Sequence, residues 1–366
     1  MIVAASTPDA QGTAETRPGL DRAAAQGVFV ALLLFTAVLV FVSIPIGIWT
    51  VFYGHLSSLY TYNSLATPYF WIGPFVAYSP VAVSVGGWFL AVTAIYIVFF
   101  AYSILQKARP QEAVMSSFKD GFSNLLSSPF LVAIIGIGFL TFASSAIDQV
   151  VSAAGVPIGG PTPFQDPLDL LLGFAASPLV EELGFRVLLI GVVALILSMG
   201  RPLRDALGAL WRPSKALEGL AVGSGASIII WIATGFSAVT FGACHVVCGS
   251  TWDIGKFPEA AFGGFVLGVL YVKYGFHVAV LVHWGVDYFG SVYSFFGQAA
   301  FGIPWSSSTQ EYVGQYLVDI DMLLLFGFAS FLVVTYLMVR KTIFWRRQRQ
   351  AVEFDKGATE GGQASV

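Results

Sequence analysis

Charged residues are scarce in this chain of 366 residues: Asp, Glu, Lys and Arg make up 11% of it, whereas hydrophobic residues make up 56%. A soluble domain carries about 25% charged residues, so this composition excludes a soluble fold. Cysteine is rare too, and two residues are too few for a disulfide scaffold. The net charge is only −3, and we expect no nucleic-acid partner. The composition therefore indicates an integral membrane protein.

The abundant feature is the long apolar run, and a transmembrane helix needs roughly 20 such residues. Eight runs qualify: 27–53, 80–104, 129–147, 168–199, 221–247, 258–274, 277–296 and 317–340. They predict an all-α, polytopic integral membrane helical bundle of about eight transmembrane helices. Pro178 lies inside the fourth run, where we expect a kink or a helix start.

The positions of Lys and Arg predict the orientation of these helices. If the N-terminus is cytoplasmic, 16 of the 18 basic residues fall in cytoplasmic segments; the exceptions are Arg186, inside an apolar run, and Lys256, in an outer loop. We therefore expect a cell-membrane protein with both termini in the cytoplasm. The weakly amphipathic segment 112–128 is either an interfacial helix or an ordinary loop.

The fourth run contains charges that a membrane helix should not carry: Glu181, Glu182 and Arg186, in SPLVEELGFRVLLIG. A charge at bilayer depth costs at least about 2.5 kcal/mol, which indicates a functional site. Glu182 and Arg186 are four residues apart, so they can form an ion pair within the helix. Glu181 then points away from Arg186, so it can take a partner on another helix and act as a general base. The alternative is a structural ion-pair cluster.

Histidines lie in two further apolar runs. His245, in FGACH, could accept a proton, bind a metal or bond a backbone carbonyl. His283 and Asp287, in HWGVD, are four residues apart and share a helix face. They could ligate one metal, the aspartate could orient the imidazole, or they could be a packing pair. Carboxylates and imidazoles on three helices together suit the activation of water for hydrolysis.

These segments resemble the motifs of a known family. EELGFR, FGACH and HWGVD are similar to the EExxxR, FxxxH and HxxxN motifs of the CAAX protease and bacteriocin-processing (CPBP) family of intramembrane proteases, over about residues 178–290. The last motif differs, because Asp287 replaces an asparagine that could donate a hydrogen bond. The resemblance implies an intramembrane endopeptidase, similar to CAAX prenyl endopeptidases, that cleaves a membrane-associated peptide or protein, lipidated or not.

The resemblance also implies roles for the motif residues. Glu181, beside Glu182, would be the catalytic base paired with His245, and His283 and Asp287 would hold the oxyanion. Arg186 and Phe241 would support them. In a metalloprotease, the ligands would be Glu181, His245, His283 and Asp287. Asp287 favours zinc, and a metal-free mechanism is the other option for this family.

The implied organisation has a cytoplasmic tail (1–26), N-terminal transmembrane helices (27–147), a CPBP-like protease core (168–296), a final transmembrane helix (317–340) and a cytoplasmic tail, basic and then disordered (341–366). Two other functions remain open. One is a catalytically inactive membrane protein of this fold, such as an immunity or partner-binding factor. The other is a proton- or cation-coupled transporter.

Three local features complete the expectations. Cys244 and Cys248 flank His245 too closely to form a zinc site with it, so we expect small apolar core cysteines. Trp and Tyr residues around 60–71 are typical of an interfacial belt. The predicted helix ends place His245 near the outer surface and His283 near the inner one. The two can meet only if the chain over 247–276 is broken or its boundaries differ.

Overall fold

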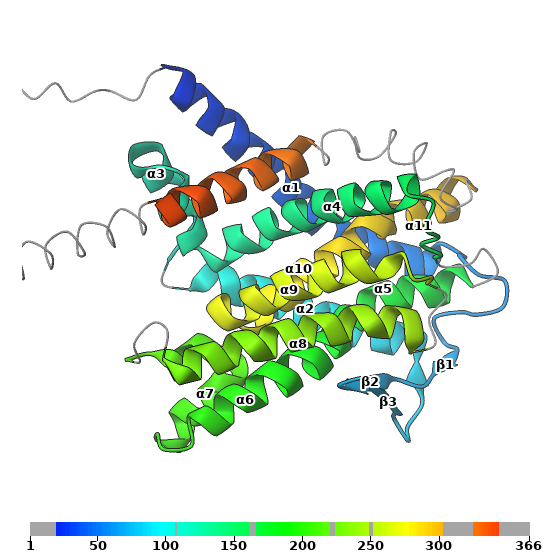
Figure 1. Cartoon of the computed structure of the whole chain (residues 1–366). Coiled ribbons are helices and arrows are strands. Elements are labelled where there is room, and N and C mark those ends of the chain that lie inside the picture. Colours follow the sequence, from blue (N-terminus) through cyan, green and yellow to red (C-terminus); the bar gives the residue numbers. More distant parts are fainter. Residues whose placement is uncertain are drawn as a thin grey trace, which may run out of the picture.

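The computed structural model describes residues 20–106, 108–160, 166–219, 224–248, 252–302 and 325–343. The predicted tails up to residue 19 and beyond 343, and the beginning of the final span at 317–324, lie outside the described residues. Long helices lie side by side through most of the described chain (Figure 1). The all-α, polytopic membrane fold is therefore confirmed.

The helices follow the predicted runs closely. Their bounds are α1 (Leu20–Tyr53), α2 (Val85–Leu105), α3 (Pro110–Asp120), η1 (Phe122–Ser127), α4 (Pro129–Ala153), α5 (Pro167–Glu182), η2 (Leu183–Gly191), α6 (Val192–Leu197), α7 (Leu203–Trp211), η3 (Pro213–Leu217), α8 (Gly225–Val247), α9 (Lys256–Tyr274), α10 (Phe276–Trp284), η4 (Gly285–Phe289), α11 (Gly290–Phe301) and the helix Leu325–Ile343. The short strands β1 (Leu65–Ala66) and β4 (Val83–Ser84) pair with each other, as do β2 (Tyr69–Ile72) and β3 (Phe75–Tyr78).

Five described helices are long and apolar enough to cross a membrane: Ala23–Tyr53, Val85–Leu105, Pro129–Ala153, Gly225–Val247 and Leu325–Ile343. The other three predicted spans are helical as well. One is α5 continued by η2 and α6, one is α9, and one is α10 continued by η4 and α11. The first and third of these are divided by the π-helices η2 and η4, so no single α-helix in them has the length of a span.

Of the kink or helix start expected at Pro178, the helix start is wrong, because Pro178 lies inside α5. Helix α5 begins at Pro167, where the Asp166 side chain accepts a hydrogen bond from the Leu168 N–H at 2.9 Å. An aspartate cap followed by proline in the first turn is a strong start signal. The irregularity comes after the glutamates instead, where η2 forms a π-helix. A second π-helix, η4, contains Asp287. Such wide turns are frequent at functional sites.

Helix α10 lies at the centre of the bundle, and every residue in it is buried. It packs against α2, α4, α5 and α9. Gly136 of α4 allows a close approach, because a Cβ there would lie 2.8 Å from Val282. The segment 112–128, predicted as either an interfacial helix or a loop, is helical: it contains most of α3 and all of η1.

Candidate active site

The site begins with an ion pair inside the bundle. Arg186 Nε lies 3.1 Å from Glu182 Oε2, and both side chains are fully buried. The structure thus contains the pair expected from their spacing. The guanidinium also lies 4.4 Å from the centre of the Phe241 ring, a cation–π contact that connects this helix to α8.

The imidazole of His283 lies close to three carboxylates. Its Nδ1 lies 3.0 Å from Glu182 Oε1, while its Nε2 lies 3.7 Å from Glu181 Oε2 and 3.5 Å from Asp287 Oδ2. The glutamates come from the end of α5, and Asp287 comes from η4, just beyond His283. Four of the predicted site residues, His283 and the three acids around it, therefore lie together.

Hydrogen-bond chemistry restricts where the protons of this cluster can be. A carboxylate paired with Arg186 only accepts, so the Nδ1 atom of His283 donates to Glu182. The Nε2 atom then faces two more carboxyl groups. One further proton must lie there, on Nε2, Glu181 or Asp287, because lone pairs would otherwise face each other. The cluster can therefore hold and release a proton.

His245 reaches the same region from the end of α8. Its Nδ1 lies 2.9 Å from the Phe241 carbonyl oxygen, and since a carbonyl only accepts, Nδ1 carries a hydrogen. In a neutral imidazole, Nε2 is then an acceptor. The Phe241 ring packs against both imidazoles, with centroids 4.6 Å from His245 and 5.6 Å from His283.

The expected separation of the two histidines at opposite membrane surfaces is therefore wrong. His245, His283 and Asp287 line one small cavity of about 60 Å³. The turn between α9 and α10 is a single residue, Gly275, with a positive φ of 106°. The helix that begins after it runs on through η4 to Phe301, beyond the predicted end at 296.

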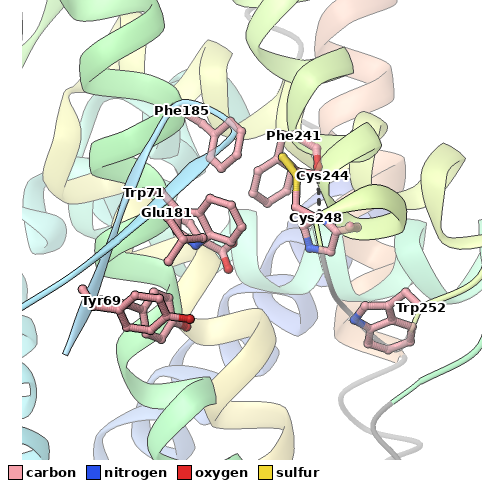
Figure 2. Close-up of a pocket in the computed structure, with 11 residues that line it drawn as sticks. Tyr69, Trp71, Glu181, Phe185, Phe241, Cys244, Cys248 and Trp252 are labelled. Carbon is pink, nitrogen blue, oxygen red and sulfur yellow. Dashed lines mark hydrogen bonds between the residues drawn. A yellow bond between two sulfur atoms is a disulfide. The ribbon is translucent and has the colours of Figure 1, made fainter. Parts of the chain in front are cut away.

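A larger cavity of about 290 Å³ lies on the other side of Phe241, and Glu181 and His245 both line it (Figure 2). Aromatic rings form most of its wall. The lining residues are Tyr69, Trp71, Val76, Tyr78, Glu181, Phe185, Phe241, Cys244, His245, Cys248 and Trp252. The carboxylate of Glu181 thus lies at the edge of a chamber suited to an apolar peptide.

The hairpin of β2 and β3 forms one wall of this chamber, which the sequence interpretation missed. Trp71 lies against Gly184, where a Cβ would be 2.6 Å from the Trp71 carbonyl oxygen. Two apolar runs, YFWI and FVAY, flank a Gly73-Pro74 turn. That pattern is typical of a hairpin and could have revealed it. Reading residues 60–71 as an interfacial belt overlooked the turn.

Tyr69 of the hairpin is a neutral donor at the chamber. Its hydroxyl lies 2.8 Å from Ser177 Oγ. Burial, and then the nearby Glu181 carboxylate, raise the pKa of Tyr69 to about 12. The phenol therefore keeps its proton at physiological pH.

The motif order and this geometry agree with a comparison to known families. Residues 163–289 match the family model described as Type II CAAX prenyl endopeptidase Rce1-like. This segment is an Rce1-like domain. The predicted resemblance to the CAAX protease family is therefore confirmed for this segment. Among curated proteins and among solved structures, no match to the chain was found.

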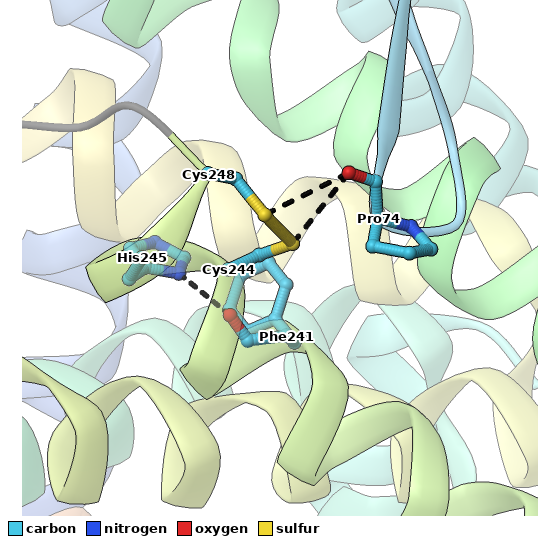
Figure 3. Close-up of a disulfide and its surroundings, with 5 residues drawn as sticks. All are labelled: Pro74, Phe241, Cys244, His245 and Cys248. Atoms are coloured by element: carbon cyan, nitrogen blue, oxygen red, sulfur yellow. Dashed lines mark hydrogen bonds between the residues drawn. A yellow bond between two sulfur atoms is a disulfide. The ribbon is translucent and has the colours of Figure 1, made fainter.

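The Rce1-like domain includes a disulfide between Cys244 and Cys248. The predicted apolar setting is confirmed for Cys244, which is buried in a hydrophobic cluster, but the disulfide was not predicted. The two Cα atoms are 4.7 Å apart at the end of α8, within the range that a disulfide spans. The Pro74 carbonyl oxygen lies 3.9 Å from Cys244 Sγ and 3.7 Å from Cys248 Sγ (Figure 3). Disulfide sulfurs carry no hydrogen, so these are packing contacts between α8 and the hairpin tip.

The predicted zinc ligands, Glu181, His245, His283 and Asp287, all lie in the Rce1-like segment. Within the described ranges, no three His, Cys, Asp or Glu side chains are grouped as ligands of one metal ion. The bonds of Nδ1 of His283 to Glu182 and of Nδ1 of His245 to a carbonyl do not oppose zinc, because metal-ligating imidazoles commonly make such a bond through their other nitrogen. Zinc therefore remains a prediction from the sequence.

Proposed function

We propose that this protein is an intramembrane endopeptidase in which Glu181 activates water. One observation carries the proposal: Glu181 lines the same aromatic chamber as His245, while its carboxylate lies 3.7 Å from His283. The match of residues 163–289 to the Rce1-like family model supports protease activity. We also propose a catalytic mechanism, a class of substrate and a reaction that uses no metal.

The Glu181 carboxylate can hold the attacking water. It accepts hydrogen bonds, and it lines the chamber together with His245. Glu181 takes one proton of the water, and the water oxygen forms a bond to the peptide carbonyl carbon. When the C–N bond breaks, Glu181 returns the proton to the leaving nitrogen.

The proton shared around His283 supports the same reaction. It places positive charge beside Glu181. This positive charge would stabilise the negative charge that develops on the attacked carbonyl oxygen. Asp287 would keep this proton in place, since it lies 3.5 Å from His283 Nε2. Glu182 and Arg186 position the ring and do not touch the substrate. No step requires a metal.

The substrate we propose is a membrane-associated peptide or protein. The chamber walls of Tyr69, Trp71 and Phe185 suit apolar side chains at the cleavage site. Lipidated substrates, prenylated ones among them, belong to this proposal, and so does cleavage of unmodified membrane peptides.

The deciding experiment uses purified protein with a library of membrane-anchored and lipidated peptides. We expect cleavage by the wild type and by Glu112→Gln, an exposed control on α3, and its loss in Glu181→Gln. Removal of a general base typically lowers the rate by 10²–10⁴-fold. Equal cleavage by Glu181→Gln and wild type would overturn the assignment.

The second candidate function is that of an inactive member of the family. Asp287 favours it, because an ionised aspartate cannot donate the hydrogen bond that asparagine can. A folded wild type that cleaves nothing in the library, together with an Asp287→Asn variant that does, would establish this alternative.

A further inference from the structure

A cleft far from the protease chamber opens between η1 and the helix Leu325–Ile343. It consists of two adjoining cavities of about 340 Å³ and about 600 Å³, and Arg340 lines both. The smaller one is lined by Gly121, Phe122, Leu332, Val333, Tyr336 and Arg340. The larger one is lined by Asp120, Ser123, Leu126, Ser127, Lys273, Leu337, Arg340 and Lys341.

Both walls of the cleft are held by contacts with the bundle. On the η1 side, the Tyr274 hydroxyl donates to the Leu126 carbonyl oxygen at 3.0 Å, and the Phe122 ring packs 5.4 Å from Phe29. On the other side, Gly138 of α4 allows the final helix to approach closely, because a Cβ there would lie 2.6 Å from Phe326. The cleft is therefore a feature of the packed fold.

The two parts of the cleft differ in chemistry. The smaller cavity offers Phe122, Leu332 and Val333, an apolar lining suited to acyl chains. The larger one gathers the cations of Lys273, Arg340 and Lys341 around the hydroxyls of Ser123 and Ser127.

The cations of the cleft are available to an anion. Asp120 is the one acid among the lining residues, and its Oδ2 accepts from Asn124 at 3.4 Å. No ion pair joins it, or any other carboxylate of the described residues, to Lys273, Arg340 or Lys341. Lys273 Nζ lies 4.9 Å from the Tyr274 ring centre, a cation–π contact that leaves the ammonium group its hydrogen-bond donors for an anion.

We propose that this cleft binds an anionic phospholipid. The phosphate would lie among Lys273, Arg340 and Lys341, with a hydrogen bond from the Ser123 hydroxyl, and the acyl chains would follow the apolar lining beside Leu332 and Tyr336. Arg340 faces both cavities, which matches the junction of head group and chains. Basic pockets between membrane helices bind acidic lipid head groups for the same electrostatic reason.

The test is native mass spectrometry of the full chain in detergent, titrated with phosphatidylglycerol or with phosphatidylcholine. We expect the wild type to retain phosphatidylglycerol preferentially. The triple variant Lys273→Gln, Arg340→Gln, Lys341→Gln should bind it roughly 100-fold more weakly, from about a fivefold loss per basic residue. The matched control Arg109→Gln, Arg204→Gln, Lys215→Gln removes three exposed cations that line neither cavity and should bind like the wild type.

Three outcomes would overturn the lipid site. They are equal retention of both lipids by the wild type, an equal loss in the two triple variants, and displacement of phosphatidylglycerol by glycerol phosphate at the same concentration as by lipid. Thermal unfolding of each variant establishes that it is folded. Loss of proteolysis in Glu181→Gln would leave lipid binding unchanged, so the two proposals fail separately.

Discussion

His283 donates through Nδ1 to the carboxylate of Glu182 at 3.0 Å, although 101 residues separate them in the chain. This bond ties the central helix α10 to the end of α5. It also fixes which imidazole nitrogen faces Glu181 and Asp287. Glu182 is thus the common partner of Arg186 and His283, and Glu181 remains for the chemistry that we propose.

The buried pair of Glu182 and Arg186 predicts strong coupling in stability. Arg186→Met should lower the free energy of unfolding by about 3–5 kcal/mol, because it leaves the Glu182 charge buried with less compensation. Glu182→Gln combined with Arg186→Met should cost clearly less than the sum of the single changes. Unfolding in mixed micelles measures all three variants. Additive costs would show that the pair is not coupled.

Gly184 predicts a steric control of the chamber wall. In Gly184→Ala, the new Cβ would lie 2.5 Å from Trp71 Cβ and 2.6 Å from its carbonyl oxygen, so the hairpin must move. We expect a loss of about 1–3 kcal/mol in stability and a fall in kcat/KM. Gly173→Ala, in the same helix with nothing within 4 Å of its Cβ, is the matched control. Similar kinetics in both variants would separate the hairpin from catalysis.

The proposed mechanism, in which Glu181 activates water and no step uses a metal, predicts independence from metal. Purified wild type should contain substoichiometric zinc, and chelators should leave cleavage unchanged. Asp287→Asn should remain active, because its amide can donate beside His283. Elemental analysis and peptide cleavage test both points. One zinc per chain that disappears in Glu181→Gln would instead support a metal-assisted mechanism.

The disulfide predicts the orientation of α8. Disulfides persist in oxidising compartments, so Cys244 and Cys248 should lie at the extracytoplasmic end, as the distribution of Lys and Arg also predicts. In intact cells, a membrane-impermeant maleimide should label no cysteine before reduction and both after it. The Cys244→Ser, Cys248→Ser variant is the background control. Labelling without reduction, or only after the cells are opened, would contradict this orientation.

Much of the site was predictable because several of its contacts join residues that are close together in the sequence. Helical geometry alone places Glu182 beside Arg186 and His283 beside Asp287, each four residues apart. The cost of charge in lipid indicates α5 as the helix that carries the candidate site. The hairpin wall was missed, since the aromatic content of residues 60–71 suggested a different role. The disulfide was missed because the same spacing also suits two buried thiols.

The amino-acid order by itself determined membrane residence, the helical runs and the pairs within one helix. Hydropathy and helix periodicity act over neighbouring residues, so they need no knowledge of the fold. Only the tertiary structure decided that His283 bonds Glu182 and that Phe241 lies between the two imidazoles. It also decided that a hairpin closes the chamber at Gly184. Those contacts join segments far apart in the chain, and side-chain packing between helices selects them.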